Sequence, residues 1–272
     1  MKHLLALLGC LCAALAAAQP QADSAARTVT RATLFSIGLD YQQDTYLSPQ
    51  AYDGLQIAIF HETLRPTHLL SHRVDQRTLF QASFTRTQNQ PRNADYLGGQ
   101  LHYDYALQYR WQPSERWRLM LGPQLGATAG ILYNTRNGNN PAQALARIQL
   151  SAAGAAQWRL HTRRRELALR ATLDFALLGA MFTPAYGQSY YELFTLGHTD
   201  HNVRATHPFN TRRIRSQVTL DVPCRVSTLR VGCYADLHGS HVNAIRHSDY
   251  SVGLLIGWVR HHLTRPARRT IP

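Results

Sequence analysis

The sequence has no internal run of apolar residues as long as the roughly 18 that a membrane-spanning helix requires. Its 272 residues are 44% hydrophobic and 17% charged, and the mean hydropathy is −0.30. This length is enough for one large all-β domain or for two ordinary domains. The missing apolar runs exclude a bundle of spanning helices, so the pattern within shorter segments has to decide the fold class.

The sequence is also almost without lysine. Lys2 is the only one, and the formal net charge of +13 therefore comes from arginine. Arginine binds phosphate groups bidentately, which suits a surface that meets anionic lipid headgroups. The arginines lie mostly at the ends of alternating segments and in turns rather than on one aromatic-rich patch, so we expect no nucleic-acid partner.

The one uninterrupted apolar stretch lies at the N-terminus. A basic start at Lys2, apolar residues over 4–18 and small residues before Gln19 are typical of a secretory signal peptide. We expect residues 1–18 to be removed and the mature chain to be exported.

Cysteine is scarce in the mature chain. Only Cys224 and Cys233 of the four cysteines follow the predicted cleavage site. An exported chain meets an oxidising compartment, and a bridge closing a hairpin is sterically plausible at this spacing. Two alternatives stay open: a Cys224–Cys233 disulfide, or two free, buried thiols.

What the sequence does have is alternation with a period of two. In WRLMLGPQLGATAGILY, residues 117–133, one set of alternate residues is apolar with an aromatic ring at each end. The other set is small, polar or charged. A period of two indicates strands, and an apolar face flanked by Trp and Tyr is typical of strands that cross a lipid bilayer.

The pattern recurs often enough to predict an all-β fold, an antiparallel up-and-down transmembrane β-barrel of ten strands. The connections alternate between short turns and long polar loops, as in outer-membrane barrels, and the longest loop runs from Phe182 to Asn210. The segment Tyr190–Leu196 could be half of another hairpin, which would make the count twelve. The predicted strands lie near 33–46, 52–63, 74–87, 97–111, 116–133, 143–160, 165–181, 210–222, 227–238 and 249–260.

These strands set the domain boundaries and the expected location. We expect a periplasmic lead over 19–32, the barrel over 33–263 and a basic tail over 264–272, in the outer membrane. The chain continues past Trp258 instead of ending on the aromatic residue that completes many such barrels. A soluble periplasmic β-protein is the rival fold.

The stretch TYLSPQAYDG, residues 45–54, resembles the T-Y-L-S-P-x-x-Y-x-G signature of a Bacteroidetes-type family of exported proteins of unknown function. The resemblance implies a small outer-membrane barrel and implies no reaction or ligand. Ser48-Pro49 favours a turn, while Tyr46 and Tyr52 can pack over a rim.

Histidines near the C-terminus raise the possibility of a metal site. His238, His241 and His247 share a predicted loop with Asp236 and Asp249, and imidazole with carboxylate can hold Zn²⁺ or Cu²⁺. We interpret them as exposed loop histidines and expect no metal or cofactor; this cluster is the first choice if a metal binds.

Charged residues on the polar faces predict ion pairs inside the barrel. A lumen of about ten strands is nearly filled by side chains, so arginines and aspartates there should pair. The alternative is a selectivity ring in a conducting pore. The residues expected in the lumen are Arg147, Arg170, Arg215, Asp104, Asp174 and Asp236.

The leading function is a structural or binding role through the long external loops, with outer-membrane lipid or lipopolysaccharide as partner. A narrow channel or transport component is the second hypothesis. The third is a lipid-modifying enzyme using Ser240 beside His241, or Ser189 near Glu192 and His198. No nucleophile elbow is present, so we do not expect an enzyme.

Overall fold

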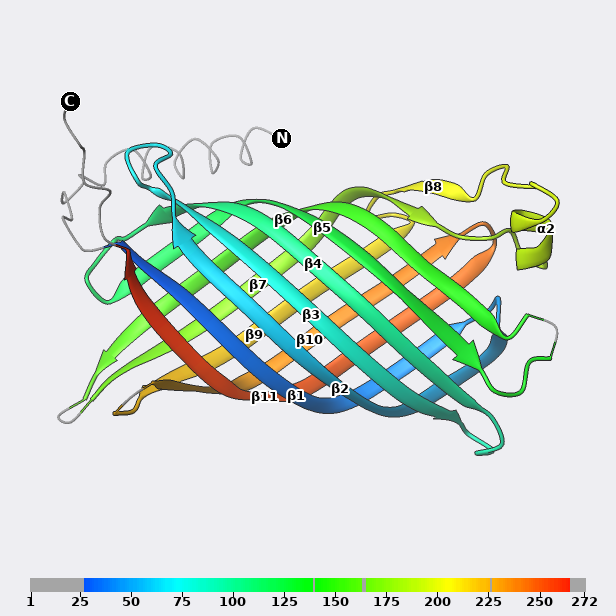
Figure 1. The fold of residues 1–272 in the computed structure, drawn as a ribbon, viewed down its shortest axis with the longest axis horizontal. Helices are drawn as coiled ribbons and strands as arrows, with labels where there is room; N and C mark the ends of the chain where they lie inside the picture. Colours follow the sequence, from blue (N-terminus) through cyan, green and yellow to red (C-terminus); the bar gives the residue numbers. More distant parts are fainter. Residues whose placement is uncertain (1–26, 139, 163–164, 226, 265–272) are drawn as a thin grey trace, which may run out of the picture.

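The structure, a computed structural model, describes residues 27–138, 140–162, 165–225 and 227–264. In these residues ten long antiparallel strands form a closed barrel (Figure 1). The predicted signal peptide and nearly all of the predicted tail lie outside the described residues. Strand β1 already begins at Arg27, so the end of the predicted lead belongs to the barrel.

Each long strand pairs with its sequence neighbours, and β1 pairs with β11 to close the sheet. The predicted up-and-down barrel of ten strands is confirmed. The strands are β1 (Arg27–Asp44), β2 (Ser48–Pro66), β3 (Val74–Asn89), β4 (Asp95–Trp111), β5 (Trp117–Asn134), β6 (Ala142–His161), β7 (Glu166–Phe182), β9 (Thr211–Pro223), β10 (Thr228–Val242) and β11 (Ile245–Thr264).

The connection between β7 and β9 corrects the twelve-strand alternative. Its residues 190–194 form a short helix, α2 (Tyr190–Phe194), instead of a strand. Ser189 and Glu192 make a capping box, in which each side chain bonds to the other residue's backbone N–H. A four-residue strand, β8 (Val203–Thr206), extends the pairing along the end of β7.

The predicted loop from His238 to Ser248 is also wrong. Strand β10 runs on to Val242 and β11 starts at Ile245, joined by Asn243 and Ala244, whose φ values are 53° and 60°. This is a two-residue hairpin turn, whose central residues need positive φ. Polar residues that face a lumen look like loop residues in a sequence, which is why the strand ends were missed.

The two rims of the barrel differ. The connections 67–73, 112–116, 162–165 and 224–227 share one rim with the start of β1 and the end of β11, at the left of Figure 1. The other rim, at the right, carries α2, β8 and the connections 90–94, 135–141 and 183–210. We call these the turn rim and the loop rim.

The outer face is apolar and edged by aromatic rings. On β11 every second residue from Tyr250 to Trp258 points outward, and Leu254 is 70% exposed. These residues cover roughly 20 Å of barrel height at the usual strand rise and tilt, close to the apolar band of outer-membrane barrels. Tyr41 stacks on Tyr250, with ring centroids 5.7 Å apart, at the end of the band nearer the loop rim. No helix in the described residues is long and apolar enough to cross a membrane.

The inward side chains form layers, and strand β2 gives their order. From the loop rim to the turn rim, its inward residues include Tyr52, Gln56, Phe60 and Glu62. Tyr52 belongs to an apolar cluster at the loop rim, where it stacks on Tyr96 with centroids 3.6 Å apart. Phe60 belongs to an apolar layer on one side of the lumen, with Leu34, Leu79, Tyr234 and Leu255 from neighbouring strands. Polar residues therefore occupy the space between two apolar layers.

Candidate functional site

Buried ion pairs fill the lumen on the turn side of the Phe60 layer. Glu62 accepts hydrogen bonds from Arg77 Nε at 2.7 Å, from Arg170 Nη2 at 3.0 Å and from Arg230 Nη1 at 3.3 Å. Arg77, which is 1% exposed, also donates to Asp174 at 3.0 Å. One carboxylate thus meets three guanidinium groups, and Asp174 and Asp221 each share one of them. We call this the Glu62 cluster.

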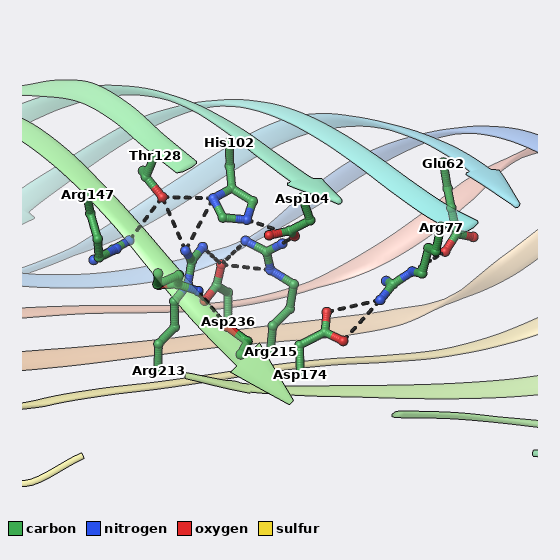
Figure 2. A network of polar contacts seen from close by, with 12 residues as sticks. Glu62, Arg77, His102, Asp104, Thr128, Arg147, Asp174, Arg213, Arg215 and Asp236 are labelled. Atoms are coloured by element: carbon green, nitrogen blue, oxygen red, sulfur yellow. Dashed lines mark hydrogen bonds and ion pairs between the residues drawn. The ribbon is translucent and has the colours of Figure 1, made fainter. Parts of the chain in front are cut away.

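A second network, drawn in Figure 2, lies nearer the loop rim by its positions along β9 and β10. Arg215 donates to Asp104 at 2.7 Å and to Asp236 at 3.2 Å, and Arg213 donates to Asp236 at 2.7 Å. His102 Nε2 lies 2.8 Å from the same Asp104. These charges are buried and paired, so this part of the lumen has the packing role of a polar core.

The structure brings five of the six predicted luminal charges into ion pairs of these two networks, and Arg147 joins the second network through Thr128. Arg147 Nη1 lies 3.1 and 2.6 Å from the two ring nitrogens of His238, and its Nη2 donates to Thr128 at 3.3 Å. Among the described contacts it meets no carboxylate.

Sequence reasoning missed Glu62, Arg77 and His102. All three lie at alternate, polar-face positions of strands whose ranges it had predicted. Continuing the alternation through those ranges would have found them.

The three candidate metal ligands are not brought together. His238 and His247 point inward with ring centroids 5.3 Å apart, whereas His241 points outward and is exposed. An odd separation along a strand puts His238 and His241 on opposite faces. The described residues contain no group of three or more His, Cys, Asp or Glu side chains that could hold a metal ion.

The cysteines are likewise apart. Pro223 pairs with Thr228, so the turn lies directly after Cys224, while Cys233 lies opposite Val218. Cys233 is therefore roughly 17 Å up the strand, too far for a bridge. Both thiols are free and exposed, which corrects both the disulfide alternative and the expected burial.

A chamber remains between the Asp104 network and the loop rim. Two adjoining pockets share Gln100, Arg147 and His238 in their linings. We call this space the loop-side chamber. One wall is apolar, from Leu145, Met181, Phe182, Val242 and Ile245.

The connection 183–210 is tied to the loop rim beside this chamber. Tyr46 donates from its hydroxyl to the carbonyl of Gln188 at 2.8 Å, and the backbone N–H of Ala144 donates to the Tyr190 hydroxyl at 2.6 Å. Burial raises the pKa of both tyrosines. Tyr46 and Tyr52, from the stretch TYLSPQAYDG, both belong to the apolar cluster of this rim.

The two enzyme candidates named from sequence are not assembled. Ser240 points into the lumen while His241 points outward. Ser189 and Glu192 are used in capping α2, and the hydrogen bonds from the Ser189 N–H and hydroxyl lower the pKa of Glu192.

Comparison with solved structures gives outer-membrane barrels. The outer membrane protease OmpT of Escherichia coli has a TM-score of 0.50 at 7% identity, with 87% of this chain and 97% of that chain covered. The transport unit of the E. coli autotransporter AIDA-I gives a TM-score of 0.44 at 8% identity, covering 89% and 93%. The translocator domain of NalP from Neisseria meningitidis gives 0.42 at 9% identity, covering 93% and 95%.

The likeness to OmpT shows the fold, which supports an outer-membrane location. Comparison with curated protein sequences finds no match. The family described as "Protein of unknown function (DUF3316)" matches residues 3–269. The chain belongs to the DUF3316 family.

Proposed function

We propose that this protein is a non-conducting outer-membrane barrel that binds a small anionic, partly apolar ligand at the loop end of its lumen. Outer-membrane lipid or lipopolysaccharide surrounds the apolar outer face. The observation that carries the binding role is the loop-side chamber, which holds Arg147 without a carboxylate partner among the described contacts.

The chemistry of the chamber supports an anionic ligand. Arg77, Arg170, Arg213, Arg215 and Arg230 each contact a carboxylate in the lumen. Arg147 instead faces the neutral partners His238 and Thr128. A guanidinium in a confined space binds most strongly an anion whose oxygens can accept two of its N–H groups. Planar carboxylate and tetrahedral phosphate groups have this geometry.

The apolar wall favours anions that also carry an apolar group. Leu145, Val242 and Ile245 line the same cavity as Arg147. A ligand with one short hydrocarbon arm and one anionic group would fill both parts, as most small-molecule sites combine an apolar wall with a few polar anchors.

The filled lumen argues against the channel alternative. The Phe60 layer, the Glu62 cluster and the Asp104 network fill the middle of the lumen with buried side chains. Refolded protein in a planar bilayer should give no steady current under applied voltage. A stable single-channel conductance would overturn the non-conducting role.

Binding is tested with simple anions. Inorganic phosphate and butyrate should raise the thermal unfolding temperature of detergent-purified protein, because a ligand that binds only the folded state stabilises it. Arg147→Gln should remove the shift. Arg159→Gln is the control, since Arg159 lies on the same face of β6 near the turn rim. Equal shifts in both variants would contradict the proposed site.

Location is tested by membrane fractionation and by heat-modifiable gel migration. A barrel in the outer membrane should partition with that membrane and migrate differently before and after boiling. Recovery in the soluble periplasmic fraction would contradict the proposal.

A further inference from the structure

Next to the loop-side chamber, a hydroxyl, an imidazole and a carboxylate occupy paired positions on three neighbouring strands. Ser240 on β10 is the register partner of His247 on β11, and His247 is the register partner of Asp44 on β1. All three side chains point inward and are buried. Register partners have Cβ atoms about 5 Å apart, so the imidazole has the hydroxyl on one side and the carboxylate on the other.

The carboxylate fixes the imidazole. His247 Nδ1 lies 2.9 Å from Asp44 Oδ2, and the other oxygen, Oδ1, accepts the backbone N–H of Tyr46 at 2.9 Å. A carboxylate on Nδ1 holds the ring in the tautomer with its proton there and leaves Nε2 as a proton acceptor. Asp44 is held on both sides, so the ring orientation is set by the β1–β2 turn.

We infer that Ser240, His247 and Asp44 form a nucleophile, base and orienting acid for the hydrolysis of a carboxylic ester with an anionic group, bound in the loop-side chamber. This rests on the proposed ligand chamber, since Ser240 and His247 line the same cavity as Arg147. Ser240 and His247 would be catalytic residues and Asp44 a positioning residue.

The reaction balances with water as the only co-reactant. Ser240 Oγ attacks the ester carbonyl carbon while its proton passes to His247 Nε2. The alcohol leaves with that proton, and an acyl group stays on Ser240. A water molecule, losing its proton to His247, then attacks the acyl group, releases the carboxylic acid and restores the serine.

The surroundings fit an ester of this class. Val242 and Ile245, one step beyond Ser240 and His247 on the same strands, give an apolar wall for an acyl chain. His238 lies beside His247 and contacts Arg147, which can take the anionic group. The level of Ser240, His247 and Asp44 lies on the loop side of Tyr41 and Tyr250, beyond the apolar band.

The test uses the full mature chain refolded in detergent. A fluorophosphonate probe, which phosphonylates an activated serine and releases fluoride, should label the wild-type protein. Ser240→Ala should abolish labelling and reduce hydrolysis of p-nitrophenyl hemisuccinate by 100-fold or more. Asp44→Asn should slow labelling 10-fold or more while keeping an oxygen for the Tyr46 N–H. Ser248→Ala is the control, because Ser248 follows His247 on the other face of β11.

Folding of each variant is checked by heat-modifiable migration. Labelling that survives Ser240→Ala, or absence of both labelling and hydrolysis in a folded wild-type protein, would overturn the inference. If phosphate and butyrate still give an Arg147-dependent thermal shift in that case, the binding function stands and only the catalytic step falls.

Discussion

The two halves of the lumen differ in how their buried arginines are paired. On the turn side, Glu62 meets Arg77, Arg170 and Arg230, and the charges fill the space. On the loop side, Arg147 contacts no carboxylate directly among the described contacts, and Asp236 and Asp249 line the chamber beside it. A buried charge without a direct counter-charge costs free energy, which the ligand that we propose would offset. The comparison therefore separates a half whose charges are paired and fill the space from a half that keeps a chamber.

The largest expected effect is at Glu62. Glu62→Gln leaves three guanidinium groups with one carboxylate fewer, and should lower the free energy of unfolding by about 3–5 kcal/mol. Asp249→Asn is the matched change in the loop-side half, where Asp249 accepts from Gln100 at 2.6 Å. It should cost about 1 kcal/mol or less. Urea unfolding of refolded protein in lipid vesicles measures both, and equal losses would break the comparison.

Two arginines give a smaller and sharper contrast. Arg170→Met removes a guanidinium that bonds to both carboxylate oxygens of Glu62 and should cost about 3 kcal/mol. Arg147→Met removes hydrogen bonds to neutral groups only and should cost about 1 kcal/mol. The same unfolding titration compares them. A larger loss at Arg147 would mean that it belongs to the stabilising network.

The connection 183–210 should respond to loss of its anchors. Tyr46→Phe removes the hydrogen bond to Gln188 and should weaken docking of this segment by about 1 kcal/mol. Limited proteolysis within 183–210 should become several-fold faster. Tyr41→Phe, a change on the outer face, is the control and should leave the cleavage rate unchanged.

The smallest expected effect is a local pH dependence at α2. The pKa of Glu192 is lowered in the folded protein from its usual value of 4.5 because the Ser189 N–H and hydroxyl donate to it. A carboxyl group with a lowered folded pKa stabilises above about pH 4.5, and the contribution is lost as the pH falls through the folded pKa. The protection factor of the Ser189 amide against hydrogen exchange should fall on acidification, and Glu192→Ala should show low protection at every pH.

The barrel could be predicted from the sequence because the apolar surroundings constrain the residues on the outer face of every strand. Residues 117–133 and 250–258 are apolar at alternate positions whatever their partners are, so strand type and number followed. The ends of the strands could not be predicted in the same way. His238 to Ser248 alternates polar residues on both faces, and only the pairing with β1 and β9 shows that these residues continue the sheet.

The candidate site was predicted only in part. Ser240 and His247 were both noticed, but Ser240 was associated with the neighbouring His241, and His247 with a metal. Adjacency in sequence puts two residues on opposite faces of a strand, whereas adjacency across strands depends on register. The turn at Asn243 and Ala244 sets that register and brings Ser240 opposite His247.

The sequence by itself determined which face of each strand meets hydrocarbon and which faces the lumen. Hydrocarbon and a polar lumen impose opposite residue types at alternate positions. Tertiary structure alone decided which charges meet across the lumen, such as Glu62 with Arg170, and which one, Arg147, is left beside a chamber. The physical reason is that closure of the sheet brings together strands distant in sequence, and their pairing register fixes the height of every inward side chain.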